Sequence, residues 1–194
     1  MTRRGETSEE YLCAVTVGER VPHDGTIQLA PHDPSWPASY ARLAERIRGA
    51  LGEGVLLLEH VGSTSVPGLC AKPIIDMVLA VSDSADEPSY VPALEAAGFR
   101  LRLREVDEFE HRLLLAPDVA GNLHVFTTGC EEIGRMLRFR DWLRAHDEDR
   151  RAYEDKKREL AARRWRHVQH YADAKSEIVR EILERAFSPA ARWE

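Results

Sequence analysis

Several features that would place a protein in a special class are missing from this sequence. Its 194 residues include only three cysteines, Cys13, Cys70 and Cys130, an odd number whose spacing does not match a metal site. No apolar run approaches the roughly eighteen residues of a membrane-spanning helix, and no apolar stretch follows the charged N-terminus to form a secretory signal. We therefore expect a soluble, cytoplasmic protein with reduced thiols and no membrane partner.

Three common catalytic motifs are also absent. A Walker-type phosphate loop needs G-x-x-x-x-G-K-[ST] before a helix, whereas here Lys72 lies four residues beyond Gly68 and Pro73 follows it. The string GSTSVPG lacks the G-x-S-x-G spacing of a serine hydrolase, and no H-E-x-x-H sequence or Cys/His cluster indicates zinc. The chain is therefore assigned to none of these classes.

Positive charge is scarce in most of the chain. The net charge is −6, with the acidic excess in residues 1–137 and a basic balance in residues 138–194. An acidic protein is a poor non-specific binder of nucleic acid, so we expect a small-molecule partner. The basic C-terminal part either faces a polyanionic ligand or is simply a solvated helical surface. The sequence does not predict an oligomeric state.

Apolar patterning predicts a sheet followed by helices. Residues 55–61 and 73–81 are short apolar runs bounded by turn residues, which is typical of buried strands. Helical periodicity opens near Ser35. Further strands are expected at 26–30, 99–104, 111–116 and 122–128, and further helices at 89–97, 130–146, 147–166 and 168–187, with Trp142 and Trp165 in the core.

The predicted domain organisation is simple. Residues 1–25 are expected to be a loosely ordered N-terminal extension, in which YLCAV at 11–15 is a candidate edge strand. A single domain at 26–187 follows, divided into a sheet core at 26–129 and C-terminal helices at 130–187. Residues 188–194 form a tail.

The stretch between the first two inner strands carries the strongest functional signal. The loop GSTSVPGLCAKP at 62–73 is rich in glycine and hydroxyl residues and ends with Lys72, so it offers donors that suit a phosphate or another anion. Asp76 is the only carboxylate among the apolar residues of the strand that follows. Because a lone buried carboxylate is costly, a cation or hydrogen bonds should answer it.

The predicted hairpin at 111–128 allows a parity argument. If Ala116 opposes Asn122, Leu113 opposes Val125 on an apolar face. Arg112 and His124 would then be diagonal neighbours on the other face, and both become candidate site residues.

The residues 60–81, HVGSTSVPGLCAKPIIDMVLAV, resemble the signature of the GrpB family. Later strings agree with it: NLHV at 122–125, LRFRDWLR at 137–144, YEDKKRELA at 153–161 and YADAKSEIV at 171–179. The resemblance covers residues 27 to 187. The family is similar in fold to nucleotidyltransferases of the DNA polymerase beta type and also occurs fused to dephospho-CoA kinases. The resemblance thus implies an α+β (α/β) fold, with a small, mixed, mostly antiparallel sheet of nucleotidyltransferase type packed against helices.

The resemblance also implies an activity and a set of site residues. Nucleotidyltransferases of this type transfer a nucleotidyl group from ATP or another NTP, with Mg²⁺ held by strand carboxylates. Here Gly62 and Ser63 match the Gly-Ser that holds the triphosphate, and Asp76 matches the first metal-binding carboxylate. The candidate catalytic residues are Ser63, Asp76, Arg112 and His124, and the candidate ligand-binding residues are His60, Gly62, Ser63, Thr64, Ser65, Lys72, Arg138, Arg140, Lys157 and Lys175, with Tyr153 and Tyr171 in the same helical motifs.

Two departures keep an alternative open. Val78 stands where a second carboxylate is expected, and His124 stands near the position of the third. Either another carboxylate replaces them and a nucleotidyl group is transferred to an unknown small acceptor, or the protein binds a nucleotide or CoA-type ligand without any transfer. His60 could equally be structural, Lys72 solvated, and the basic helical residues surface partners such as Arg158 with Glu154. The candidate replacement carboxylates are Glu59, Glu108 and Glu110.

Overall fold

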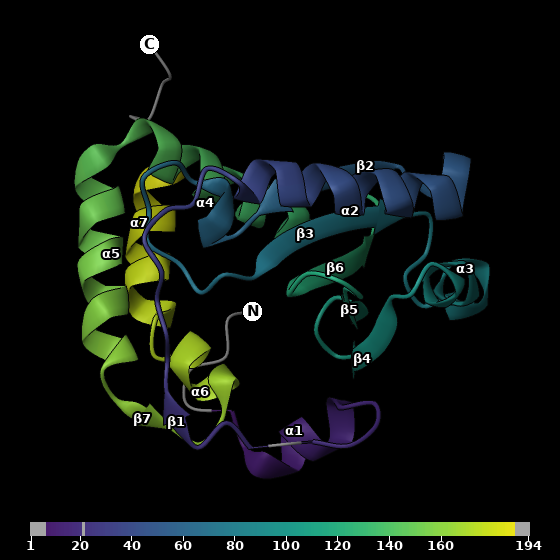
Figure 1. Cartoon of the computed structure of the whole chain (residues 1–194), viewed down its shortest axis with the longest axis horizontal. Coiled ribbons are helices and arrows are strands. Elements are labelled where there is room, and N and C mark those ends of the chain that lie inside the picture. The colour runs from purple at the N-terminus through teal and green to yellow at the C-terminus, as the bar shows by residue number, and fades with distance from the viewer. Residues whose placement is uncertain (1–6, 21, 189–194) are drawn as a thin grey trace.

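A computed structural model describes residues 7–20 and 22–188 of the chain. Its centre is a five-stranded sheet with the order β2-β3-β6-β5-β4, in which only β3 and β6 run parallel (Figure 1). The expected mixed, mostly antiparallel α+β fold is confirmed. The strands are β2 (Leu57–Val61), β3 (Ile75–Val81), β4 (Arg100–Glu105), β5 (His111–Leu115) and β6 (Gly121–Thr127).

One face of the sheet is sealed by helices α2 (Trp36–Leu51) and α3 (Val91–Ala96). Met77 and Leu79 of β3 point into this core and are completely buried with Ile47 of α2. Alternation along the strand places the neighbouring Asp76 and Val78 on the opposite face.

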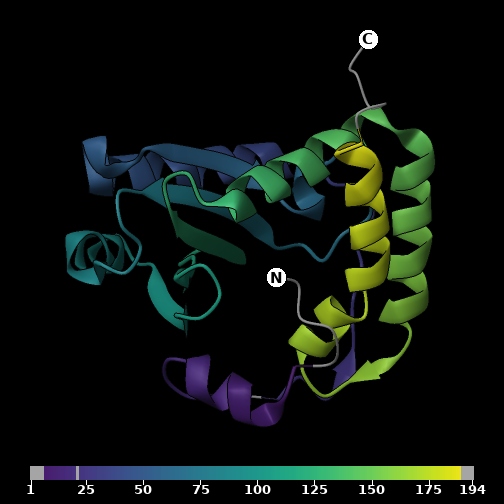
Figure 2. The same cartoon turned by 180° about the vertical axis from the view of Figure 1, so that it is seen from behind.

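The opposite face is only partly covered. Helix α4 (Glu131–Ala145) crosses it, as the rear view shows (Figure 2), and Ile133 packs on Val78, Val61 and Phe126. This cover lies over one end of the face, so Asp76 at the start of β3 borders open space instead.

The C-terminal helices form a second core beside the sheet. Helices α5 (Asp147–Ala161) and α7 (Ser176–Ala186) run side by side (Figures 1 and 2), and Ile182 packs with Trp142 of α4. Leu69, from the loop after β2, is fully buried in the same cluster. The loop is therefore held against these helices. The expected helix at 168–187 is interrupted: α6 (Val168–Asp173) ends before Lys175, and α7 begins after it.

Short elements complete the chain. The expected strand at 26–30 contributes only Thr26 to a two-stranded ribbon, and Ala30 forms a bridge with Ala71. YLCAV at 11–15 is helical, because Ser8 caps the segment by accepting from the Tyr11 amide at 3.1 Å. The predicted tail at 188–194 lies outside the described residues except for Ser188. The remaining elements are α1 (Glu9–Val15), β1 (Gly25–Thr26), β7 (Arg164–Trp165) and the 3-10 turns η1 (Gly52–Gly54), η2 (Ser63–Ser65) and η3 (Glu87–Ser89).

Within the described part of the chain, every helix is too short or too polar to cross a bilayer.

Candidate functional site

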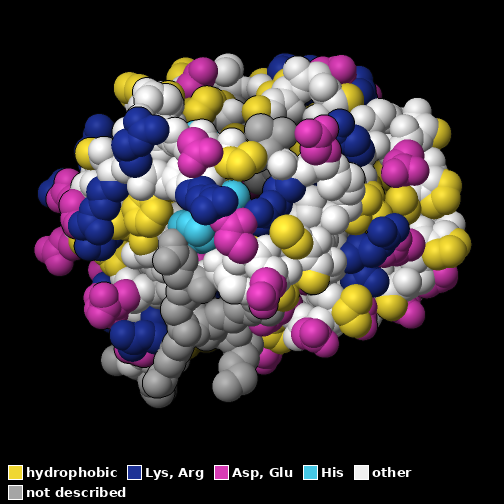
Figure 3. Space-filling view, turned by 90° about the horizontal axis from the view of Figure 1, so that it is seen from below, with side chains coloured by type: hydrophobic (Ala, Val, Ile, Leu, Met, Phe, Trp, Pro, Cys, Tyr) yellow, Lys and Arg dark blue, Asp and Glu magenta, His cyan; other side chains and the backbone are white. Residues whose placement is uncertain are grey.

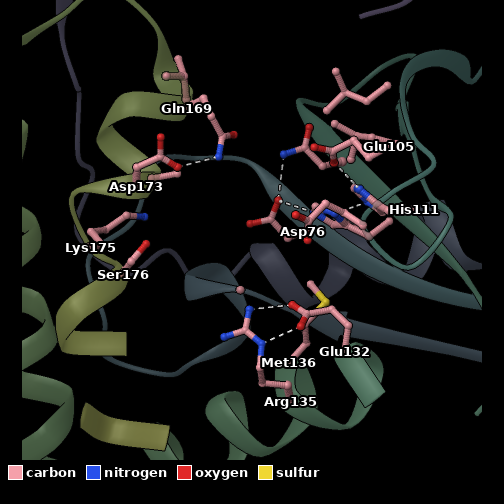
Figure 4. Close-up of a pocket in the computed structure, with 18 of the residues that line it drawn as sticks. Asp76, Glu105, His111, Glu132, Arg135, Met136, Gln169, Asp173, Lys175 and Ser176 are labelled. Atoms are coloured by element: carbon pink, nitrogen blue, oxygen red, sulfur yellow. Dashed lines mark hydrogen bonds and ion pairs between the residues drawn. The ribbon is translucent and has the colours of Figure 1, made fainter. Parts of the chain in front are cut away.

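A cavity of about 1300 Å³ opens between the uncovered face of the sheet and the C-terminal helices. Viewed from below, histidine, basic and acidic side chains gather around its hollow (Figure 3). The close-up shows His111 on one side, Lys175 on the other and Asp76 between them (Figure 4). The segment from Thr7 to Val15 adds a further wall. The cavity therefore joins parts of the chain that are far apart in sequence.

Asp76 lies on the cavity floor against the corner formed by Gly62 and Ser63. A Cβ atom on Gly62 would be 2.5 Å from the Asp76 Oδ2 atom, and Gly62 has a φ of +67°, so only glycine fits here. Asp76 Oδ1 accepts a hydrogen bond from Asn122 Nδ2 at 2.9 Å and lies 3.9 Å from His124 Nε2. The side chain is 28% exposed, so the carboxylate is open to a ligand.

The pKa of Asp76 reflects this setting. Burial raises the pKa, but His124, the Asn122 hydrogen bond and the charge of Lys72 together lower it below its ordinary value. Asp76 is consequently an anion at neutral pH.

Three lysines line the cavity together with Asp76. Lys72 comes from the loop, Lys157 from α5 and Lys175 from the break between α6 and α7, and all three line the cavity. Burial lowers the pKa of Lys157 to about 7 and of Lys175 to about 8, and Asp76 counteracts both shifts only in part. Burial and then the charge of Lys175 lower the pKa of Lys72. The three amines are thus less readily protonated than free lysines.

Two tyrosines accompany the lysines. The ammonium of Lys175 lies 4.5 Å from the ring centre of Tyr171, and that of Lys157 lies 5.3 Å from the ring centre of Tyr153. Lys157, only 2% exposed, also donates to the carbonyl oxygen of Cys70, which fixes the loop to α5. The Tyr171 hydroxyl is buried and has no hydrogen-bond partner among residues 7–20 and 22–188. Its hydrogen-bonding capacity is therefore not used by the described part of the chain.

Several predicted ligand-binding residues make hydrogen bonds that hold the loop together, and one of them, Thr64, also lines the cavity. Thr64 Oγ1 donates to the Ile74 carbonyl at 3.1 Å and contacts His60 Nε2 at 3.0 Å, while Ser65 Oγ donates to the Gly62 carbonyl at 2.6 Å. His60 points to the opposite face, where it stacks on Tyr40, and burial lowers its pKa to about 4. Its position follows from its pairing with Met77 in the β2–β3 register.

The predicted position of Arg112 is wrong. Ala116 does not pair with Asn122, because its amide donates to the Gly121 carbonyl. In the observed register Arg112 opposes Val125, and Leu113 opposes His124. This shift by one residue turns Arg112 away from the cavity, where it is 4% exposed. Its guanidinium donates to Glu87 at 2.7 Å and to Glu110 at 3.1 Å.

The two predicted arginines of α4 divide between the cavity and the outside. Arg138 lines the cavity and lies over the Phe187 ring at 5.4 Å. Arg140 donates to Glu59 at 2.8 Å and to the His60 carbonyl at 2.9 Å, outside the cavity lining. Of the three replacement carboxylates, Glu59 and Glu110 are thus bound to arginines, and Glu108 lines the cavity.

Sequence reasoning missed three polar residues of the sheet. His111 Nδ1 lies 2.7 Å from Glu105 Oε2, and His111 Nε2 lies 3.1 Å from His124 Nδ1. Asn122 holds Asp76. The correct hairpin register would have found His111, because it shares the face of His124, whereas Asn122 is on that face in either register. The ion pair of Arg135 with Glu132 on α4 was also missed (Figure 4).

Comparisons with known proteins give the chain its family. A model of the family described as GrpB protein matches residues 26–185. The chain belongs to the GrpB family. A UPF0157 protein of Halalkalibacterium halodurans is 60% identical over 179 residues, which are 92% of each chain, and one of Streptomyces coelicolor is 45% identical over 160 residues, 82% of this chain and 84% of that protein.

Two further similarities bear on the GrpB domain. The crystal structure of conserved protein GrpB from Enterococcus faecalis has a TM-score of 0.70 at 26% identity, covering 82% of this chain and 96% of that one. A dephospho-CoA kinase of Mycolicibacterium paratuberculosis is 29% identical over 188 residues, 83% of this chain but only 46% of that protein.

The GrpB cavity does not fit a two-metal centre. Val78, in the place of the second carboxylate, is completely buried in the cluster with Ile133. Among residues 7–20 and 22–188, no three His, Cys, Asp or Glu side chains are grouped so that they could hold a metal ion. Asp76 alone is a poor Mg²⁺ site, since Mg²⁺ needs near-octahedral oxygen coordination.

Proposed function

We propose that this GrpB protein binds a nucleotide or CoA-type ligand and places its phosphates between the Gly62–Ser63 corner and Lys72 and Lys175. The observation that carries the proposal is a cluster of three lysines with lowered pKa values in the cavity lining, and Asp76 is the carboxylate whose charge acts on all three. The rest of the lining adds two arginines and five carboxylates, so the excess of positive charge belongs to the lysine cluster and not to the whole wall.

A diphosphate or triphosphate would pair with the protonated amines of these lysines. Buried ammonium groups are costly unless anions pair with them, and phosphate oxygens are strong acceptors. The Tyr171 hydroxyl, which has no hydrogen-bond partner in the described part of the chain, is a buried donor beside the same cavity. Because an anion raises the pKa of nearby amines, ligand binding at pH 8 should take up protons through Lys157 and Lys175.

A relative supports the CoA-type ligand. The name dephospho-CoA kinase describes a protein that acts on dephospho-CoA, and about half of that protein matches this chain. Dephospho-CoA joins an adenosine to a pantetheine arm through a diphosphate, which is the type of group that the lysines suit.

Nucleotidyl transfer from ATP to a small acceptor is the second candidate. It is favoured by Asp76 facing the Gly62–Ser63 corner, the arrangement expected for the nucleotidyltransferase type of fold. The single carboxylate and the buried Val78 favour binding without transfer. Transfer, Mg²⁺ dependence and the nucleotidyltransferase resemblance therefore stay predictions.

Calorimetry tests the first candidate. ATP and dephospho-CoA are titrated into the wild type, Lys175→Met and the control Lys156→Met, in EDTA and again in Mg²⁺. Lys156 is a matched control because it pairs with Glu159 on α5 and does not line the cavity. Loss of one charge-assisted contact should weaken binding about tenfold in Lys175→Met and leave Lys156→Met unchanged.

The same titrations contain the contrary results. Absence of binding by both ligands, or equal affinity in the two variants, contradicts the proposed phosphate site. Binding that needs Mg²⁺ and is lost in Asp76→Ala would favour nucleotidyl transfer instead.

A further inference from the structure

A line of four polar side chains crosses the sheet and ends in the cavity. Glu105 of β4 contacts His111 of β5, His111 contacts His124 of β6, and His124 Nε2 lies 3.9 Å from Asp76 Oδ1 of β3. The first two contacts, 2.7 and 3.1 Å long, are direct hydrogen bonds, and the last distance is too long for one. The proposed function makes no use of Glu105 or His111.

The hydrogen-bond partners determine which ring nitrogens of His111 and His124 carry a proton. The Glu105 carboxylate accepts from the Tyr11 hydroxyl at 2.7 Å and can only accept, so His111 must donate from Nδ1. Burial is the main cause that lowers the pKa of His111, which keeps the ring neutral and leaves Nε2 as an acceptor. His124 must then donate to it from Nδ1.

It follows that the uncharged form of His124 compatible with these contacts has its lone pair on Nε2, the nitrogen nearest Asp76. Asp76 Oδ1 is an acceptor as well, and it already receives one hydrogen bond from Asn122. When His124 is uncharged, two acceptors therefore face the cavity 3.9 Å apart, whereas protonated His124 forms an ion pair with Asp76 instead. Such a pair of acceptors suits a ligand that brings two donors at a similar spacing, one for each acceptor.

We infer that Asp76 and His124 form a subsite for the cis vicinal diol of a ribose, with Glu105 and His111 as positioning residues that fix the His124 tautomer. One ribose hydroxyl donates to Asp76 Oδ1 and the other donates to His124 Nε2. The ligand identity rests on the proposed function, whereas the tautomer does not. The subsite selects ligands with a free ribose diol, such as ATP and dephospho-CoA, over CoA, whose ribose carries a phosphate on one of these oxygens.

Nuclear magnetic resonance of the imidazole nitrogens tests the tautomer in the ligand-free protein at pH 8. His124 is assigned by its disappearance in His124→Phe. The expected spectrum has the His124 proton on Nδ1. Glu105→Ala should lower the population of this tautomer, while circular dichroism shows that the variant remains folded. A proton on Nε2 in the wild type overturns the inference, whatever the protein binds.

Calorimetry in EDTA tests the diol. Wild type should bind ATP about tenfold more tightly than 2′,3′-dideoxy-ATP, since two hydrogen bonds to Asp76 and His124 are lost. The ratio should fall towards one in His124→Phe and persist in Gln169→Ala, a cavity residue whose amide bonds only to Asp173 in the contacts described. Dephospho-CoA should likewise bind more tightly than CoA.

The two proposals fail in different ways. Equal binding of ATP and its dideoxy analogue by the wild type contradicts the diol subsite and leaves the phosphate site intact. If neither nucleotide nor dephospho-CoA binds, the proposed function fails, and the diol subsite fails with it even when the tautomer is as expected.

Discussion

The two faces of β3 have opposite roles although their residues alternate along one strand. Met77 and Leu79 are completely buried under α2, whereas Asp76 opens to the cavity on the other face. The same division runs through β6, where Leu123 is buried and Asn122 holds Asp76. The contrast shows that polar residues of a candidate site can occupy one face of a strand while apolar residues fill the core on the other, because successive side chains point to opposite faces. The following predictions test whether the two faces are energetically independent.

The largest difference is expected between neighbours on β6. Leu123→Ala leaves a cavity in the sealed core and should lower the free energy of unfolding by about 2–5 kcal/mol. Asn122→Ala removes one hydrogen bond to Asp76 and should cost about 1 kcal/mol. Urea unfolding measures both, and comparable losses in the two variants would contradict the division of the strand.

Gly62→Ala should cost about 1–3 kcal/mol, because alanine is strained at a φ of +67°. It should also displace Asp76, since the added Cβ would overlap the carboxylate at 2.5 Å. In an Asp76→Ala background the same substitution should cost less, because the overlapping atoms are gone. An unchanged cost in the double variant, measured by urea unfolding, would argue against the close packing of these two residues.

Arg112→Met tests the corrected hairpin register. It breaks the contact with Glu87, which keeps its other partner Arg104, and should lower stability by about 2 kcal/mol. Ligand affinity should not change, because Arg112 points away from the cavity. A loss of ATP or dephospho-CoA affinity comparable with that of Lys175→Met would restore Arg112 to the site.

The last expected effect is a pH slope. The pKa of Lys157 is about 7 in the folded protein and about 10.4 when the side chain is free, so the unfolded chain binds more protons between these values. Stability therefore rises with pH in this window. Lys157→Met should reduce the slope by at most about 1.4 kcal/mol per pH unit, from unfolding curves at pH 7, 8 and 9. Lys156→Met should retain the wild-type slope, and equal slopes in wild type and Lys157→Met would contradict the buried amine.

The sequence predicts most of the sheet and the position of Asp76. Strong apolar runs bounded by glycine and proline mark β2 and β3. Alternation along β3 then places Asp76 and Met77 on opposite faces of the sheet. The resemblance to GrpB proteins also brings Lys157 and Lys175 into consideration before any coordinates.

The predictions that are wrong or missing concern side chains whose positions depend on strand register or on packing between distant segments. Arg112 and His111 exchange faces when the hairpin turn shifts by one residue, and the alternating pattern of β5 does not fix that turn. The break that presents Lys175 to the cavity has no glycine or proline to mark it. His60 lies next to the loop at 62–73 in sequence, yet its ring is on the other side of the sheet.

The cavity also lies between two separately packed hydrophobic clusters, one beneath the sheet and one around Trp142 and Ile182. A ligand that contacts Asp76 and Lys175 at once would act as a crosslink between the two clusters. The empty protein should then lose its C-terminal helices before its sheet on heating, while the liganded protein should melt in a single cooperative transition.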